Sequence, residues 1–306
     1  MSNIYDLVIL GGGAAGLTAG IHALRSGLKT VLIERLMLGG QIINADIIEN
    51  YPGFPTGITG PDLATALQEQ ASDLAIEYAF GSAVSLKTDD GFLVVGTESE
   101  KFTTKSVIIA IGGDPNTLGI PGEKELEAQG VSSCATCDGY FFTGQEVVVI
   151  GGGDTAIDEA TYLSTMCSKI TVIHRRDQLR ASKLLQERAF NNPKVTFVFD
   201  TVVESINGDA TVDSVTLCNV QTGERQTLPT SGVFISIGVH PSTQLFENLL
   251  TLDTGGHIVV DVAMATNVPG VFAAGVCRSG TAGQLANIIG DGATAAWSAQ
   301  TYLETL

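Results

Sequence analysis

The chain contains two copies of one structural pattern, and this repeat constrains the fold more than any other feature of the sequence. Residues 6–35 read DLVILGGGAAGLTAGIHALRSGLKTVLIER, and residues 146–176 read EVVVIGGGDTAIDEATYLSTMCSKITVIHRR. The two segments align without a gap. Each has an apolar run typical of a buried parallel strand, a glycine turn, a stretch rich in Ala and Leu that indicates a helix, and a second apolar strand. The repeat therefore predicts two β–turn–α–β units.

The glycine turns have the spacing of dinucleotide-binding turns. Gly11, Gly13 and Gly16 form G-x-G-x-x-G in the first unit. These glycines permit the tight turn, the approach of a pyrophosphate to the backbone and close packing of helix on strand. The phosphates would then lie at the positive N-terminus of the helix. The second unit has the permitted G-x-G-x-x-A form, with Gly151, Gly153 and Ala156.

The second strands of the two units end differently. The first ends at Glu34, whose carboxylate can accept hydrogen bonds from ribose hydroxyls and repels a 2′-phosphate. The aligned position in the second unit is His174, followed by Arg175, Arg176 and Arg180. Three arginines at this point indicate a phosphate, although they could instead form an ordinary solvated helix start. The first site suits the adenosine of FAD or NAD, and the second suits NADPH.

Two similar strands indicate that one domain is inserted in the other. VIIAIGGDP (107–115) and VFISIGVHP (233–241) both end in Gly-x-x-Pro. We expect the chain to cross between domains near residues 115 and 245, which predicts a discontinuous FAD-binding domain (1–115 plus 246–306) and an inserted NADPH-binding domain (116–245). The fold class is α/β, with two Rossmann-like, three-layer ββα dinucleotide-binding domains. TFVFDTVVESINGD and SVTLCNV predict a small antiparallel sheet in the inserted domain.

The composition of the chain argues against some classes of binding partner and cellular location. The 306 residues are enough for about two domains. A formal net charge of −17 argues against a nucleic acid or an anionic membrane as partner, because both need a basic surface. The N-terminus, MSNIYDLVIL, has no charged leader or cleavage site, and its apolar run is too short to cross a bilayer. Five cysteines are too few for a secreted disulfide scaffold, so we expect a cytoplasmic location.

Cys134 and Cys137 form a C-x-x-C pair that allows three kinds of chemistry: half of a zinc site, a structural disulfide or a redox dithiol. A closed zinc site needs four ligands, but there is no second C-x-x-C and the four histidines are isolated, so we expect no metal. A structural disulfide in so small a loop would stabilise the fold little, and it would be unusual in the cytosol.

The redox interpretation is favoured because neighbouring thiols can reduce a disulfide by exchange. C-x-x-C geometry and a nearby helix N-terminus can lower the pKa of a thiol. Asp138 follows directly, as a proton carrier or as a helix N-cap. Because NADPH does not reduce disulfides efficiently by itself, a flavin is needed as a relay.

The motifs together resemble those of the low-molecular-weight thioredoxin reductases. They are CATCDG, GGGDTA, HRRDQLRA and the segment from Gly39 to Pro55, and the resemblance extends from about residue 5 to 303. It implies a homodimer with one FAD per subunit, which passes a hydride from NADPH to FAD, then electrons to the Cys134–Cys137 disulfide and on to thioredoxin. It also implies that Cys134 attacks thioredoxin, Cys137 faces the flavin and Asp138 acts as the acid. The inserted domain would rotate about the two crossings, so that NADPH and the disulfide reach the flavin in turn.

The motifs and the resemblance assign cofactor-binding residues along the whole chain. For FAD these are Gly11, Gly13, Ala14, Ala15, Glu34, Arg35, Gly40, Gln41, Asn50, Gly112, Gly275, Val276, Gly283, Gln284 and Leu285. For NADPH they are Gly151, Gly153, Asp154, Thr155, His174, Arg175, Arg176 and Arg180. Asn50 could bind the polar edge of a flavin, or serve as a turn residue before Tyr51 and Pro52.

The chain departs from the family at two of these positions. Val276 replaces an Asp that binds the flavin's ribityl chain or pyrophosphate, and Gly283 replaces an Arg beside the ring. We expect FAD to bind nevertheless, because the other motifs are intact. The departures keep alternatives open: a dithiol oxidase that uses oxygen, a reductase fed by ferredoxin, or a non-catalytic redox sensor. Cys277, directly after Val276, is expected to be a packing residue, with a reactive thiol as the alternative.

Overall fold

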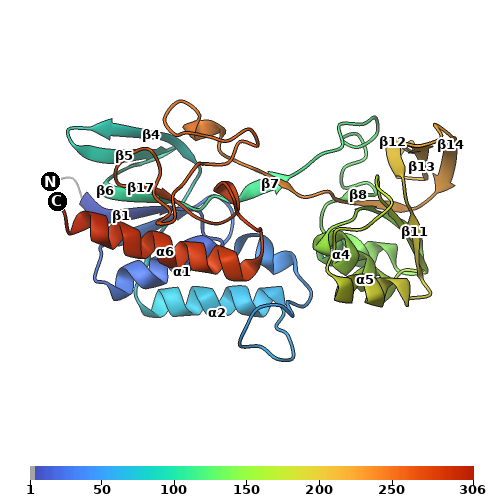
Figure 1. The fold of residues 1–306 in the computed structure, drawn as a ribbon, viewed down its shortest axis with the longest axis horizontal. Coiled ribbons are helices and arrows are strands. Elements are labelled where there is room, and N and C mark those ends of the chain that lie inside the picture. The colour runs from blue at the N-terminus through green and yellow to red at the C-terminus, as the bar shows by residue number, and fades with distance from the viewer. Residues whose placement is uncertain (1–3) are drawn as a thin grey trace. The chain divides into compact units, whose positions relative to one another are not determined.

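The computed structural model describes residues 4–306, and the chain divides into two compact units (Figure 1). Unit 1 comprises Met1–Asp114 and His240–Leu306, and unit 2 comprises Pro115–Val239. The chain passes between them along two short paired strands, β7 (Gly113–Pro115) and β16 (Val239–Pro241). The sequence placed the second crossing near residue 245, whereas in the structure it lies at Val239–Pro241. Which nucleotide each unit binds stays a prediction.

Unit 1 is built on a seven-stranded sheet. Its strands are β1 (Ile4–Leu10), β2 (Thr30–Glu34), β3 (Glu77–Phe80), β4 (Ala83–Asp89), β5 (Phe92–Thr97), β6 (Lys101–Ile109) and β17 (Val271–Ala273). The order is β3-β2-β1-β6-β5-β4, and β17 also pairs with β6. Strands β3, β2, β1, β6 and β17 pair in parallel, whereas β4, β5 and β6 pair antiparallel. β6 therefore joins a parallel sheet to an antiparallel hairpin.

The parallel strands of unit 1 are covered on both faces, as their continuous apolar runs predict. The helices are α1 (Ala14–Arg25), α2 (Gly60–Asp73) and α6 (Leu285–Leu303), with the 3₁₀ turns η1 (Gly40–Asn44), η3 (Gln244–Phe246) and η4 (Gly275–Cys277). Leu7 and Ile9 pack with α1 and α6, whereas Val8 and Leu10 pack with residues of β4 and β5. Each such fully buried side chain contributes about 1.5–3 kcal/mol.

Unit 2 repeats this architecture with a five-stranded parallel sheet in the order β11-β10-β9-β15-β8. These strands are β8 (Val131–Ser132), β9 (Glu146–Gly151), β10 (Lys169–Ile173), β11 (Val195–Val198) and β15 (Gly232–Ser236). Its helices are α3 (Ala135–Asp138), α4 (Asp154–Ser164) and α5 (Lys183–Phe190), with the 3₁₀ turn η2 (Gly139–Phe142). Val147 and Val149 pack with α4. None of the helices in residues 4–306 is long and apolar enough to cross a membrane.

The other face of this sheet is covered by a small antiparallel sheet. Its strands are β12 (Thr201–Asn207), β13 (Ser214–Asn219) and β14 (Arg225–Pro229). Val148 and Ile150 pack against Val215 and Leu217 of this sheet. The two units thus confirm the predicted α/β fold with two Rossmann-like domains. One detail was wrong: the first part of TFVFDTVVESINGD forms β11 and pairs in parallel with β10, so only its second part joins the antiparallel sheet.

The first glycine turn allows a close contact between strand and helix in unit 1. Gly11 has φ of +102°, and an added Cβ would overlap the carbonyl group of Ala110. At Gly16, an added Cβ would overlap the carbonyl oxygen of Gly11. Both glycines are therefore required by the backbone itself, because no side-chain movement could relieve either overlap.

Gly16→Ala is expected to destabilise the protein by about 3 kcal/mol, because the methyl group would force α1 away from the turn. The measurement is the free energy of unfolding in urea, followed by circular dichroism. Gly290→Ala is the matched control: Gly290 lies inside α6 with no atom within 4 Å of an added Cβ. That change should stabilise the helix by about 0.5–1 kcal/mol. Equal effects of the two substitutions would contradict the packing argument.

Candidate active site

The two repeated glycine turns leave the N-termini of α1 and α4 open. Both helices begin after a glycine N-cap, Gly13 and Gly153, and neither has a side-chain cap hydrogen bond. In contrast, α2 is capped by the Thr59 hydroxyl. An added Cβ at Gly153 would meet nothing within 4 Å, and the atom nearest to one at Gly13 would be 3.9 Å away. The donor N–H groups and the open space fit the pyrophosphate of a dinucleotide at each turn.

Glu34 lies at the end of β2, directly beside the first turn. Its Oε2 accepts a hydrogen bond of 2.6 Å from the Gly12 N–H, and its Oε1 accepts one of 2.8 Å from the Leu36 N–H. These bonds fix the carboxylate and leave lone pairs for ribose hydroxyls. The next residue, Arg35, lies 3.3 Å from Asp114 in an exposed ion pair, which contributes little to stability.

Segments from distant parts of the chain meet at this turn. The Gly39 N–H donates to the Gly12 carbonyl at 2.8 Å, which brings Gly40 against Gly13. Gly275 lies so close to Ala15 that an added Cβ would be 3.1 Å from the Ala15 methyl group. The structure therefore gathers Gly11, Gly13, Ala14, Ala15, Glu34, Gly40 and Gly275 in one region of unit 1.

The remaining residues predicted to bind FAD form separate pairwise contacts near this region. The Asn50 side chain donates to Gln284 at 2.9 Å, and the Gln41 side chain donates to the Gly113 carbonyl at 2.7 Å. Leu285, the first residue of α6, packs in an apolar cluster with Ala14. Gly112 and Gly283 both have positive φ and open space at the Cβ position, and Val276 is half-buried in η4. The FAD assignments of these residues stay predictions.

A largely buried ion pair holds the turn that contains Val276. The Arg278 guanidinium donates to both carboxylate oxygens of Asp291, at 2.8 Å each, and Asp291 also accepts from the Gly275 N–H at 3.1 Å. Only 15% of the Arg278 side chain and 7% of the Asp291 side chain are exposed. Sequence reasoning did not identify this pair, although Asp291 is the one charged residue in the α6 sequence.

The residues predicted to bind NADPH meet in unit 2. The Arg180 N–H donates to the Gly152 carbonyl at 2.6 Å, and Asp154 accepts from the Ser182 N–H at 2.7 Å. This folds the arginine loop back onto the second glycine turn. Thr155 lies on the first turn of α4.

His174 and the three arginines differ in their exposure. His174 is buried against Gly152, and its Nε2 has no hydrogen-bond partner in the described part of the chain. Burial, followed by the charges of Arg180, Arg176 and Arg175, lowers the pKa of His174. The three arginines are exposed, and none forms an ion pair within residues 4–306. This cluster of positive charge fits a phosphate group.

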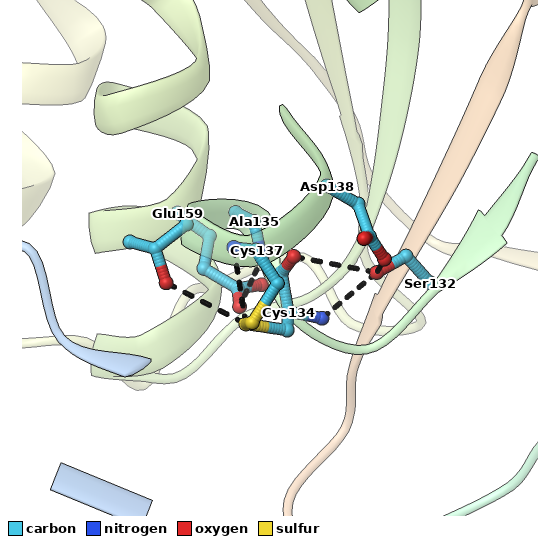
Figure 2. Close-up of a disulfide and its surroundings, with 7 residues drawn as sticks. Ser132, Cys134, Ala135, Cys137, Asp138 and Glu159 are labelled. Carbon is cyan, nitrogen blue, oxygen red and sulfur yellow. Dashed lines mark hydrogen bonds between the residues drawn. A yellow bond between two sulfur atoms is a disulfide. The ribbon is translucent and has the colours of Figure 1, made fainter. Parts of the chain in front are cut away.

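Cys134 and Cys137 form a disulfide at the start of α3, with their Cα atoms 5.3 Å apart (Figure 2). Cys134 is the N-cap residue of α3, and its Sγ accepts a hydrogen bond of 3.3 Å from the Cys137 N–H. Cys134 is half-buried and Cys137 is exposed. No group of three or more His, Cys, Asp or Glu residues within 4–306 could hold a metal ion. Because Cys134 and Cys137 are bonded to each other and Cys137 is exposed, the pair has the geometry of a dithiol that can be oxidised and reduced.

Ser132 connects Asp138 to the disulfide, and sequence reasoning did not identify it. The Ser132 hydroxyl donates to Asp138 Oδ2 at 2.6 Å and accepts from the Cys134 N–H at 3.0 Å, as Figure 2 shows. Asp138 makes no side-chain cap hydrogen bond to the following turn η2, so its alternative role as an N-cap is not observed. The carboxylate is instead held beside the two cysteines by Ser132.

Sequence reasoning also did not identify two further features beside the disulfide. Glu159 projects from α4 and binds the backbone of α3, and nothing in the sequence distinguishes it from an ordinary helix glutamate. Tyr140 and Phe141 follow the cysteines and are 79% and 73% exposed. Their position after CATCDG could have marked an apolar surface at the dithiol, of the kind that protein partners cover.

Cys277 is a packing residue in this structure. It is fully buried, and its Sγ lies 3.4 Å from the carbonyl oxygens of Ile109 and Ala274. Burial raises the pKa of the thiol to about 11. The thiol is therefore protonated at neutral pH and shielded from solvent, which argues against the alternative of a reactive thiol.

Comparison with known proteins extends these observations to the whole chain. The family model described as "Pyridine nucleotide-disulphide oxidoreductase" matches residues 5–298. A thioredoxin reductase of Peptoclostridium acidaminophilum is 43% identical over 99% of this chain and 98% of its own length. That of Bacillus subtilis (strain 168) is 44% identical over 99% of this chain and 96% of its own. The crystal structure of Lactococcus lactis thioredoxin reductase (FR conformation) has a TM-score of 0.97 and 43% identity, and the match covers 99% of this chain and 100% of that one.

Proposed function

The chain belongs to the pyridine nucleotide-disulphide oxidoreductase family, among the thioredoxin reductases, and from this premise we propose that it uses NADPH and FAD to reduce the disulfide of thioredoxin. The observation that carries the proposal is the Cys134–Cys137 disulfide at the start of α3, in a unit that also contains a dinucleotide turn and a cluster of exposed arginines. Exposed aromatic side chains beside the disulfide support a protein as its substrate.

The residues of each unit fit one of the two cofactors. In unit 1, the N–H groups of α1 would hold the FAD pyrophosphate and Glu34 the adenosine ribose. In unit 2, the N–H groups of α4 would hold the pyrophosphate of NADPH, and Arg175, Arg176 and Arg180 its 2′-phosphate. When bound, these cofactors supply the two electrons that convert the Cys134–Cys137 disulfide to two thiols.

The dithiol then reduces thioredoxin by two exchange steps. The Cys134 thiolate attacks one sulfur of the thioredoxin disulfide, which forms a mixed disulfide and releases the other thioredoxin sulfur as a thiolate that takes up a proton. The Cys137 thiolate next attacks the Cys134 sulfur, which releases the second thioredoxin thiol and re-forms the Cys134–Cys137 disulfide. Asp138, held by Ser132 at 2.6 Å, moves the proton at the leaving sulfur.

A second candidate is motivated by Val276 and Gly283, which lack the polar groups expected near the flavin. It is a disulfide enzyme of the same fold that takes electrons from ferredoxin, or that passes electrons from dithiols to oxygen. The arginine cluster argues against it, because those side chains would then have no phosphate to bind.

Cys134→Ser is expected to abolish NADPH-dependent reduction of thioredoxin while leaving the flavin absorbance spectrum intact, because only the attacking sulfur is lost. The measurement is a coupled assay in which oxidised thioredoxin is the last electron acceptor. Cys218→Ser, at a half-buried cysteine on β13, is the matched control and should keep full activity. Flavin that is reduced by ferredoxin but not by NADPH would favour the second candidate. Protein that stays colourless with added FAD would favour the non-catalytic sensor.

Arg176→Ala is expected to raise KM for NADPH by about 10–100-fold and to leave KM for NADH unchanged, because one charged hydrogen bond to the 2′-phosphate is lost. The measurement is the steady-state rate with each nucleotide. Lys124→Ala removes an exposed cation elsewhere in unit 2 and is the control. If both nucleotides lose affinity equally, the arginines do not read the 2′-phosphate.

We also propose that the protein is a homodimer in the cytoplasm, as the family resemblance and the cysteine content indicate. Sedimentation equilibrium of the FAD-loaded protein is expected to give twice the 31.9 kDa mass of the chain. A monomer at micromolar concentration would contradict the dimer.

A further inference from the structure

Glu159 is a half-buried acid whose position the proposed exchange steps do not explain. It lies on α4, in the helix layer of unit 2, and its carboxylate is directed at the start of α3 (Figure 2). Its Oε1 accepts a hydrogen bond of 3.3 Å from the Ala135 N–H. Its Oε2 accepts a hydrogen bond from the Ser236 hydroxyl at the end of β15. The one carboxylate therefore joins three elements: α4, β15 and the helix that carries the dithiol.

The Ala135 N–H is a group that needs such a partner. Ala135 is the first residue of α3, so its N–H has no acceptor within the helix. Only 1% of Ala135 is exposed, which leaves little access for water. A buried N–H without an acceptor costs about 1–3 kcal/mol. The Ala135 amide is also directly bonded to Cys134, so whatever holds this amide also fixes the backbone of the cysteine turn.

The carboxylate is itself held in place. Burial raises the pKa of Glu159, and the hydrogen bonds from Ser236 and Ala135 act in the opposite direction. The Ser236 hydroxyl thus restricts the side chain at the oxygen that does not face the dithiol. α3 is a single turn of four residues and cannot hold its own position by helix propensity.

We propose that Glu159 is a positioning residue for the dithiol: anchored by Ser236, it holds the Ala135 amide and keeps Cys134 and Cys137 in the arrangement from which their disulfide forms. The role assigned to the dithiol rests on the proposed function. Holding two thiols in place raises their effective concentration for each other, and so favours the disulfide over the dithiol. Loss of the Glu159 carboxylate should therefore shift the pair toward the reduced form.

The test is the equilibrium of the FAD-loaded protein with glutathione: the Cys134–Cys137 disulfide plus two glutathione molecules gives the dithiol plus glutathione disulfide. The fraction of each form is measured by acid quenching, alkylation and peptide mass spectrometry, which distinguishes these two cysteines from the other three. Glu159→Ala is expected to lower the equilibrium constant for disulfide formation about tenfold, or about 30 mV for this two-electron couple. Glu159→Gln keeps an oxygen acceptor for Ala135 and should stay within about twofold of the unmodified protein.

Two further variants test the anchor and the charge. Ser236→Ala should shift the equilibrium in the same direction by about threefold, and it keeps the proposal testable if Glu159→Ala does not fold. Combining it with Glu159→Ala should add nothing, because Ser236 acts through Glu159. Glu187→Gln removes the same charge from an exposed site on α5 and should cause no shift.

Three results would overturn the proposal: an unchanged equilibrium in Glu159→Ala, an effect of Glu159→Gln as large as that of Glu159→Ala, or additive effects of Glu159→Ala and Ser236→Ala. The glutathione equilibrium needs neither NADPH nor thioredoxin. A protein that fails to reduce thioredoxin would therefore disprove the proposed function and leave this measurement readable.

Discussion

Parallel strands must be buried on both faces, and this constraint determines the architecture of both units. An apolar strand such as β1 or β9 leaves no face that water can solvate, so each sheet needs two covering layers. In unit 1 these layers are the helices α1 and α6 and the antiparallel strands β4 and β5. In unit 2 they are α4 and the sheet β12-β13-β14. The glycine turn at the end of β1 or β9 is then the place where backbone N–H groups stay uncovered, and both predicted nucleotide sites lie there.

Polar groups in the two units are organised around backbone amides. Glu34 binds the amides of Gly12 and Leu36, Asp291 binds that of Gly275, and Glu159 binds that of Ala135. Each carboxylate holds a turn from which a predicted site residue projects. In an acidic chain such internal hydrogen bonds give carboxylates a structural use, and the largely buried Arg278–Asp291 pair fixes a turn in the same way.

The repeat, the sheet layers and the dithiol could be predicted from the sequence because each has a local signature. Gly11, Gly13 and Gly16 follow one strand and extend into the first turn of one helix, and Cys134 and Cys137 are three residues apart. The supporting contacts could not be predicted, because their partners are distant in the chain. Ser236 and Glu159 are 77 residues apart, and Asn50 and Gln284 are 234 apart. Strand β11 was misassigned for a related reason: a short alternating segment can pair in either direction, and only its neighbour β10 decides.

The pairing of β7 with β16 has a consequence for how the chain assembles. Sheet formation in unit 1 requires β17 to join β6, although all of unit 2 separates them in the sequence. An unfolded insert would make this a long loop to close, with a corresponding entropic cost. When unit 2 is folded, its two ends lie side by side at the paired strands β7 and β16. The inserted unit then acts as a short connection between the two parts of unit 1. Folding of unit 2 therefore lowers the entropic cost of completing the sheet of unit 1. During synthesis, unit 1 cannot complete this sheet until β17 has emerged.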